Sequence, residues 1–149
     1  MKYLILFIFS FYLFANSGYE VFEEKDNHGD NIPYAKVYGI NESIELFIGV
    51  SKPKVLSLDE TQNKRIKLLR CFGGNIGTSS LAGYYYTYVL DFKTKKILGY
   101  IEFIDKEDSN NHVSIKPKWK FNKESIEVSY RDWNYDGDYK TKTFILSTH

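Results

Sequence analysis

The amino-acid sequence predicts an all-β fold, a small antiparallel sandwich or barrel of about six to eight strands. Apolar and polar residues alternate with a period of two in several short runs, and Gly, Asn and Asp turn signals separate these runs. Tyrosine and phenylalanine, which suit a pleated sheet, number 13 and 11 of the 149 residues. Long helical periods that would supply crossover connections are absent, so we do not expect a parallel sheet.

The first 17 residues are typical of a secretory signal peptide. Lys2 precedes an apolar run that ends at Ala15, and Ala15 and Ser17 are the small residues that a cleavage site requires. The run is shorter than the roughly 20 apolar residues of a membrane-spanning helix. We therefore expect the segment 1–17 to be removed on export. Residues 18–149 would then form a single secreted β-rich domain, periplasmic or extracellular.

Charge and cysteine content argue against several classes of function. The chain has 20 Lys and Arg against 19 Asp and Glu, and loss of Lys2 with the signal leaves the domain formally neutral. A neutral domain has no net field that attracts nucleic acid or an anionic membrane. Cys71 is the single cysteine, so an intramolecular disulfide is excluded. Its apolar neighbours predict a buried thiol, and an intermolecular disulfide is the alternative.

The first part of the domain predicts short strands. Residues 20–32 are acidic and rich in turn formers, which indicates a loosely held lead-in or a first short strand. Ile44, Leu46 and Ile48 would share one face and Glu45 and Phe47 the other, as in a half-buried strand. From these patterns we expect strands at residues 34–40, 43–50 and 54–58.

Residues 57–72 allow two interpretations. A capping box at the start of the segment and Gly73-Gly74 after it predict one short helix near residues 58–72. A polar turn followed by a strand with Ile66 and Leu68 on one face predicts a β-hairpin instead. We favour the hairpin, because the spacing of apolar and polar residues resembles that of the later segment 89–97.

The remainder of the chain is predicted to be β-structure. A glycine-rich stretch at residues 73–83 is expected to be a surface loop and, because loops often carry function, a binding tip. A turn at residues 93–95 separates two long apolar runs, and a polar loop occupies residues 105–111. The expected strands are 84–92, 96–104, 113–121, 125–133 and 139–147.

Aromatic side chains are the best candidates for a contact surface. Tyr84, Tyr86 and Tyr88 would share one face of their strand, with Tyr85 and Thr87 on the other. Rigid amphipathic rings are frequent in binding surfaces, although tyrosine is also common in sheets for its packing alone. Trp133 falls on the polar face of its strand. The predicted binding surface consists of Tyr84, Tyr86, Tyr88, Trp133 and Tyr139, beside the glycine-rich loop.

One acidic segment resembles a calcium-binding loop. Asp132, Asn134, Asp136 and Gly137 match positions one, three, five and six of that motif. Position nine is a lysine and position twelve a threonine, where the motif has a glutamate. The candidate metal ligands are Asp132, Asn134, Asp136 and Asp138, and calcium is the only cofactor that the sequence suggests.

A plain β-hairpin explains the same segment and is the interpretation that we favour. Asp136-Gly137 is a strong turn signal. A three-residue turn at 135–137 would place Ile126 opposite Leu146 and Val128 opposite Phe144, so that apolar residues face each other.

The sequence contains no recognisable catalytic motif, and we expect a non-enzymatic protein. The function that we expect is binding to a protein partner outside the cytoplasm, as an inhibitor or immunity-type protein does. The alternative is a calcium- or saccharide-binding module of the cell envelope.

Overall fold

The computed structural model describes residues 18–46, 53–75, 82–106, 116–131 and 139–147, and it confirms the all-β class. These residues contain no helix. The predicted signal peptide lies outside them. Ten strands are described: β1 (Tyr19–Lys25), β2 (Asn31–Val37), β3 (Ser43–Glu45), β4 (Lys54–Glu60), β5 (Ile66–Asn75), β6 (Ala82–Asp91), β7 (Lys96–Lys106), β8 (Lys118–Phe121), β9 (Ser125–Arg131) and β10 (Tyr139–Ile145).

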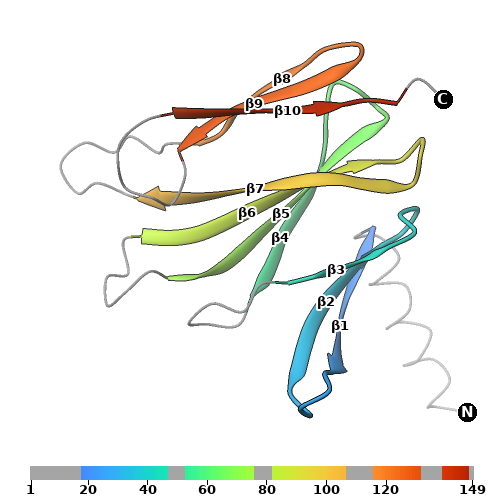
Figure 1. Ribbon diagram of the computed structural model, residues 1–149, viewed down its shortest axis with the longest axis vertical. Coiled ribbons are helices and arrows are strands. Elements are labelled where there is room, and N and C mark those ends of the chain that lie inside the picture. The colour runs from blue at the N-terminus through green and yellow to red at the C-terminus, as the bar shows by residue number, and fades with distance from the viewer. Residues whose placement is uncertain (1–17, 47–52, 76–81, 107–115, 132–138, 148–149) are drawn as a thin grey trace, which may run out of the picture.

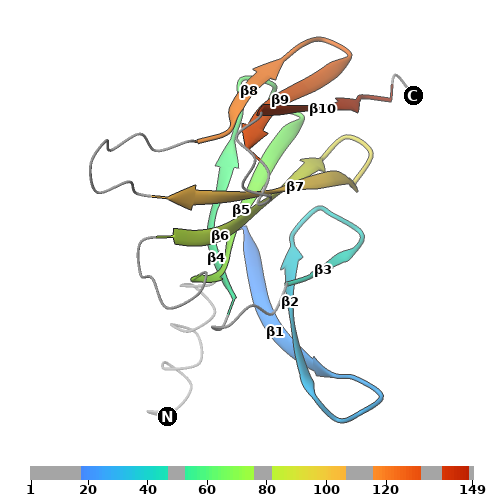
Figure 2. The same cartoon turned by 60° about the vertical axis from the view of Figure 1, so that its left-hand side comes forward.

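The strands form three antiparallel sheets that follow the order of the chain. The N-terminal sheet has the order β1-β2-β3, the central sheet β4-β5-β6-β7, and the C-terminal sheet β10-β9-β8. The central sheet lies between the other two along the long axis of the molecule, and the β1–β2 hairpin extends away from it (Figures 1 and 2). The acidic segment that was expected as a lead-in or a short strand forms β1 and the turn that follows it.

Both faces of the central sheet are buried, and each belongs to a separate core. Side chains alternate across the sheet, so Tyr86 and Tyr88 of β6 face one way while Val89 faces the other. The first core joins the N-terminal and central sheets and contains Ala35, Val37, Ile40, Ile44, Leu46, Leu69, Cys71, Tyr86, Tyr88 and Leu90. The second joins the central and C-terminal sheets and contains Ile66, Leu68, Val89, Ile101, Phe103, Ile126, Val128, Phe144 and Leu146.

The β4–β5 hairpin confirms the favoured interpretation of residues 57–72, and the alternative helix is wrong. Side-chain and backbone hydrogen bonds close the turn between the two strands. The Thr61 hydroxyl lies 2.8 Å from the Asn63 carbonyl and 2.9 Å from the Ile66 carbonyl, and the Asn63 side chain accepts from the Arg65 amide at 3.1 Å. In the strand, Ile66 and Leu68 lie on the same face and both pack in the second core. This packing stabilises the hairpin relative to a short isolated helix.

The β9–β10 hairpin forms as predicted, but its register differs from the prediction by two residues. Phe144 pairs with Ile126, not with Val128. A shift of two keeps every side chain on its face, so alternation alone does not distinguish the two registers. Contacts with β7 favour the observed one. The Phe144 ring packs against Gly99 so closely that a Cβ added to this glycine would lie 3.0 Å from the ring. The Lys142 ammonium donates to the Tyr100 carbonyl at 2.8 Å.

Candidate functional site

A cleft of about 610 Å³ lies between the central sheet and the strand β8. It is the candidate functional site because it combines apolar walls with a charged rim, as ligand sites commonly do. The central sheet provides one wall and the segment 116–121 provides the other. The apolar side chains that line these walls are Leu68, Tyr85, Phe103, Pro117, Trp119 and Phe121.

The central and C-terminal sheets come into contact on the side of β7. On that side β10 approaches β7, where Lys142 is bonded to the Tyr100 carbonyl and its ammonium lies 5.7 Å from the centre of the Tyr100 ring. On the other side the sheets end in β4 and β8, which do not pair with each other. The cleft extends from residues 59–62, at the end of β4, across the central sheet to β8.

Stacked aromatic pairs form both walls. Tyr85 of β6 and Phe103 of β7 lie with ring centroids 5.7 Å apart and planes 18° from parallel. On β8, alternation turns Trp119 and Phe121 to the same side, with centroids 6.4 Å apart and an interplanar angle of 17°. Phe103 is buried, whereas the other three rings are partly exposed. The walls therefore present rigid ring faces and edges to a ligand.

Charged side chains surround the mouth of the cleft. Asp59 and Arg70 form an ion pair of 3.3 Å on the central sheet, and Lys120 lies 3.7 Å from Glu127 on the C-terminal sheet. Lys116 is exposed at the rim. These groups remain in contact with water, so they contribute to orientation and selectivity more than to stability.

Cys71 lies beneath the cleft in the first core, with no exposed surface, and its predicted burial is confirmed. Burial raises the pKa of its thiol to about 12. The thiolate is the reactive form, and at pH 8 it would be on the order of 10⁻⁴ of the total. We expect a disulfide reagent at pH 8 to react at least about 100-fold more slowly with the native protein than with the urea-unfolded chain. Equal rates would show that the thiol is accessible.

The predicted tyrosine surface is largely part of the core. Tyr86 has no exposed surface and Tyr88 is 6% exposed, so both pack in the core and do not form the exposed contact surface that the sequence predicted. The Tyr88 hydroxyl donates to the Glu45 carbonyl at 3.2 Å and so joins the central sheet to the N-terminal one. Tyr84 is partly buried against the same core. The row faces inward because the N-terminal sheet covers this side of the central sheet.

The remaining predicted site residues have different outcomes. Tyr139 is 50% exposed on β10, and the Arg131 guanidinium lies 5.3 Å from the centre of its ring. Trp133 and the candidate calcium ligands, Asp132, Asn134, Asp136 and Asp138, lie outside the described residues. In the glycine-rich stretch, Gly73 and Gly83 belong to β5 and β6, and the segment 76–81 between these strands is not described.

Sequence reasoning did not identify the cleft. One wall comes from residues between 59 and 103 and the other from residues 116–121, and only the packing of the C-terminal sheet brings them together. One local signal was available, because Trp119 and Phe121 alternate with lysines and so occupy one face of a short strand. The opposite row of the tyrosine segment, which includes Tyr85 and Thr87, lines the cleft, and of the predicted row only Tyr86 is among the described lining residues.

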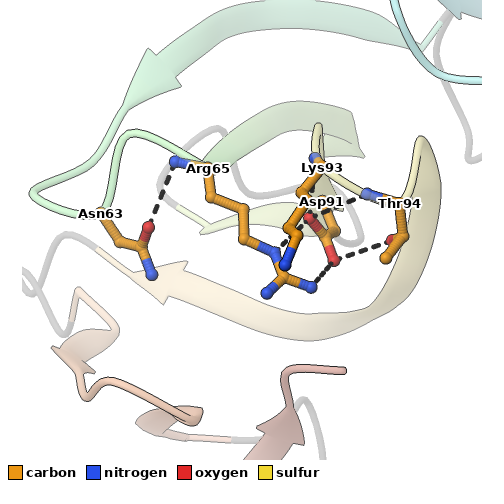
Figure 3. A network of polar contacts seen from close by, with 5 residues as sticks. All are labelled: Asn63, Arg65, Asp91, Lys93 and Thr94. Atoms are coloured by element: carbon orange, nitrogen blue, oxygen red, sulfur yellow. Dashed lines mark hydrogen bonds and ion pairs between the residues drawn. The ribbon is translucent and has the colours of Figure 1, made fainter. Parts of the chain in front are cut away.

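A second polar cluster, around Asp91, has a structural role. Figure 3 shows that the Arg65 guanidinium reaches the Asp91 carboxylate through two nitrogens, and its Nε lies 2.6 Å from Oδ1. The Thr94 hydroxyl donates at 2.8 Å and the Lys93 amide at 3.0 Å. Burial alone would raise the pKa of Asp91, but these hydrogen bonds lower it to about 2. The cluster thus closes the β6–β7 turn, which the sequence placed correctly at residues 93–95.

The described ranges contain neither a helix long and apolar enough to cross a membrane nor a group of three His, Cys, Asp or Glu side chains arranged to hold a metal ion. Comparison of the chain with models of protein families, with curated proteins and with solved structures finds no match.

Proposed function

We propose that this chain is an exported, non-catalytic binding protein that recognises a protein partner through the aromatic cleft. The observation that carries the proposal is the pair of stacked aromatic walls, Tyr85–Phe103 and Trp119–Phe121, around a space of about 610 Å³. The signal-like segment at the start of the chain supports export. An inhibitor or immunity-type protein is the concrete form of this proposal.

The chemistry of the cleft suits a side chain inserted by a partner. Binding energy in protein interfaces is concentrated in a few apolar or aromatic anchors that fill pockets and are ringed by polar contacts. Here the pocket is provided by rings on two rigid sheets, and the polar ring by Arg70, Lys116 and Lys120. Rings already held by stacking lose little conformational entropy when a partner binds.

A saccharide ligand is the second candidate. Trp119 and Phe121 are partly exposed and nearly parallel, and such a surface also stacks against the apolar face of a sugar ring. The two candidates differ in what is captured: a protein partner gives a stoichiometric polypeptide, whereas a saccharide gives retention on glycan with no polypeptide.

The test is affinity capture by residues 18–149 from envelope and secreted extracts, with calcium and with a chelator. We expect the wild type to retain one stoichiometric protein and Trp119→Ala to weaken its affinity at least about tenfold, because an anchor pocket loses one wall. Circular dichroism and the melting temperature establish that the variant is folded.

Tyr38→Ala is the matched control, since Tyr38 is an exposed aromatic residue just after β2, in the N-terminal part of the chain. We expect it to retain the partner with unchanged affinity. Undiminished capture by a folded Trp119→Ala variant would contradict the placement of the site in the cleft. Dependence of capture on calcium would instead favour the acidic segment that follows β9.

A further inference from the structure

The backbone of β8 has one edge that faces away from its partner strand. The Asn122 amide donates to the Ser125 carbonyl at 2.8 Å, which identifies these two residues as a hydrogen-bonded pair at the β8–β9 turn. In an antiparallel ladder, bonded and non-bonded pairs alternate. The pairs Phe121–Ile126 and Trp119–Val128 are therefore non-bonded pairs. Consequently the N–H and C=O groups of Trp119 and Phe121 point away from β9.

This edge is the boundary of the cleft. Among the described strands β8 is the last of its sheet, so no strand of that part of the chain pairs with it on the side away from β9. Trp119 and Phe121, whose backbone groups point outward, also line the cleft with their side chains. A strand bound at this edge would gain main-chain hydrogen bonds and place alternate side chains over the aromatic walls.

Three lysines give the edge a charge. Lys116, Lys118 and Lys120 occupy alternate positions and are exposed, and of the three only Lys120 has an ion pair within the described part of the chain. Lysines on an edge strand discourage pairing with neutral or basic strands. The same charges favour an acidic strand, so the lysines both exclude unsuitable strands and select an acidic partner strand.

We propose that the partner contributes an extended segment that adds to the free edge of β8 as a further strand. The segment has apolar or aromatic residues at the positions that face the cleft, and Asp or Glu at the alternate positions beside Lys118 and Lys120. This inference rests on the proposed function and specifies the form in which a protein partner occupies the cleft.

The test uses a displayed library of random twelve-residue peptides, selected on immobilised residues 18–149. We expect enriched peptides to alternate acidic with apolar residues. We also expect methylation of the backbone nitrogens on one edge of a selected peptide to abolish binding, while methylation on the other edge leaves it intact, since only one edge pairs. Failure to enrich any sequence, or enrichment without alternation, overturns the proposal.

Charge reversal tests the selectivity of the edge. Lys118→Glu combined with Lys120→Glu is expected to weaken binding of a selected acidic peptide at least about tenfold. The matched control, Lys64→Glu with Lys95→Glu, reverses two exposed lysines in the turns of the central sheet and is expected to leave the affinity unchanged. Equal losses in both double variants would show that only net charge matters, and would overturn a site at β8.

Hydrogen exchange separates this inference from the proposed function. On addition of a selected peptide or of the captured partner, the amides of Trp119 and Phe121 are expected to become protected. A partner that depends on Trp119 for capture but leaves both amides unprotected would uphold the cleft and overturn strand addition. Protection of these amides in the protein alone, together with dimerisation measured by ultracentrifugation, would show that a second copy covers the edge and would also overturn it.

Discussion

Replacement of Asp91 by alanine is expected to lower the free energy of unfolding by about 3 kcal/mol. The carboxylate has no exposed surface and accepts hydrogen bonds from Arg65, from the Thr94 hydroxyl and from the Lys93 amide. Its removal leaves the guanidinium and the turn amides without their acceptor. Urea unfolding of the wild type and of Asp91→Ala at pH 7 measures the loss.

The pH dependence of stability provides the control for this prediction. The pKa of Asp91 is lowered from 3.8 to about 2 in the folded protein. A lowered pKa means that the folded state binds the proton less well than the unfolded state, so the carboxylate stabilises the fold above about pH 4. This contribution is lost as the pH falls from about 4 through about 2. Asp91→Asn is expected to lack that part of the acid transition.

A double-mutant cycle assigns the effect to the ion pair itself. Asp91→Asn and Arg65→Met each remove one partner, and their combined effect is expected to fall short of the sum by about 1–3 kcal/mol. Additive effects, or a wild-type acid transition in Asp91→Asn, would contradict the role that we give to the cluster.

The fold could be predicted where local pattern and turn chemistry agree. The turn at residues 93–95 follows Asp91, whose side chain caps the turn, and long apolar runs flank it. The β4–β5 hairpin was harder to predict, because a capping box and two glycines also matched a helix. The structure shows the tertiary reason for the hairpin: Leu69 and Cys71 enter one core while Ile66 and Leu68 enter the other. A strand between two cores needs apolar residues on both faces, which obscures alternation.

The candidate site was less accessible to prediction because its parts are distant in the sequence. Alternation correctly separated Tyr84, Tyr86 and Tyr88 from Tyr85 and Thr87, but it does not say which row another sheet will cover. The choice depends on the N-terminal sheet, whose Ala35, Val37 and Ile44 pack against the first row. The same limit explains the β9–β10 register, which contacts with β7 determine.

Replacement of Tyr86 by alanine is expected to lower the free energy of unfolding by about 3–5 kcal/mol. Among the described residues, Tyr86 is the largest side chain without exposed surface, and its ring centroid lies 6.2 Å from that of Tyr84 and 5.7 Å from that of Tyr88. Removal of the ring leaves a cavity between two sheets that packed β-strands cannot close. A domain of this size has a total stability of roughly 5–15 kcal/mol, so the variant would lose a substantial part of it.

Tyr139→Ala is the matched control, because Tyr139 belongs to the same predicted contact surface but is 50% exposed. Its effect on stability is expected to stay within about 0.5 kcal/mol, as for most surface substitutions. Urea unfolding of the two variants therefore separates packing from contact. If Tyr86→Ala were as stable as the wild type but failed to bind the partner, the tyrosine row would be a contact surface. The N-terminal sheet that covers this row would then have to move away on binding. If the stability of Tyr86→Ala falls as expected, any loss of binding by Tyr86→Ala follows from its destabilisation. The contact surface is then expected on the opposite face of the central sheet, where Tyr85 and Phe103 line the cleft.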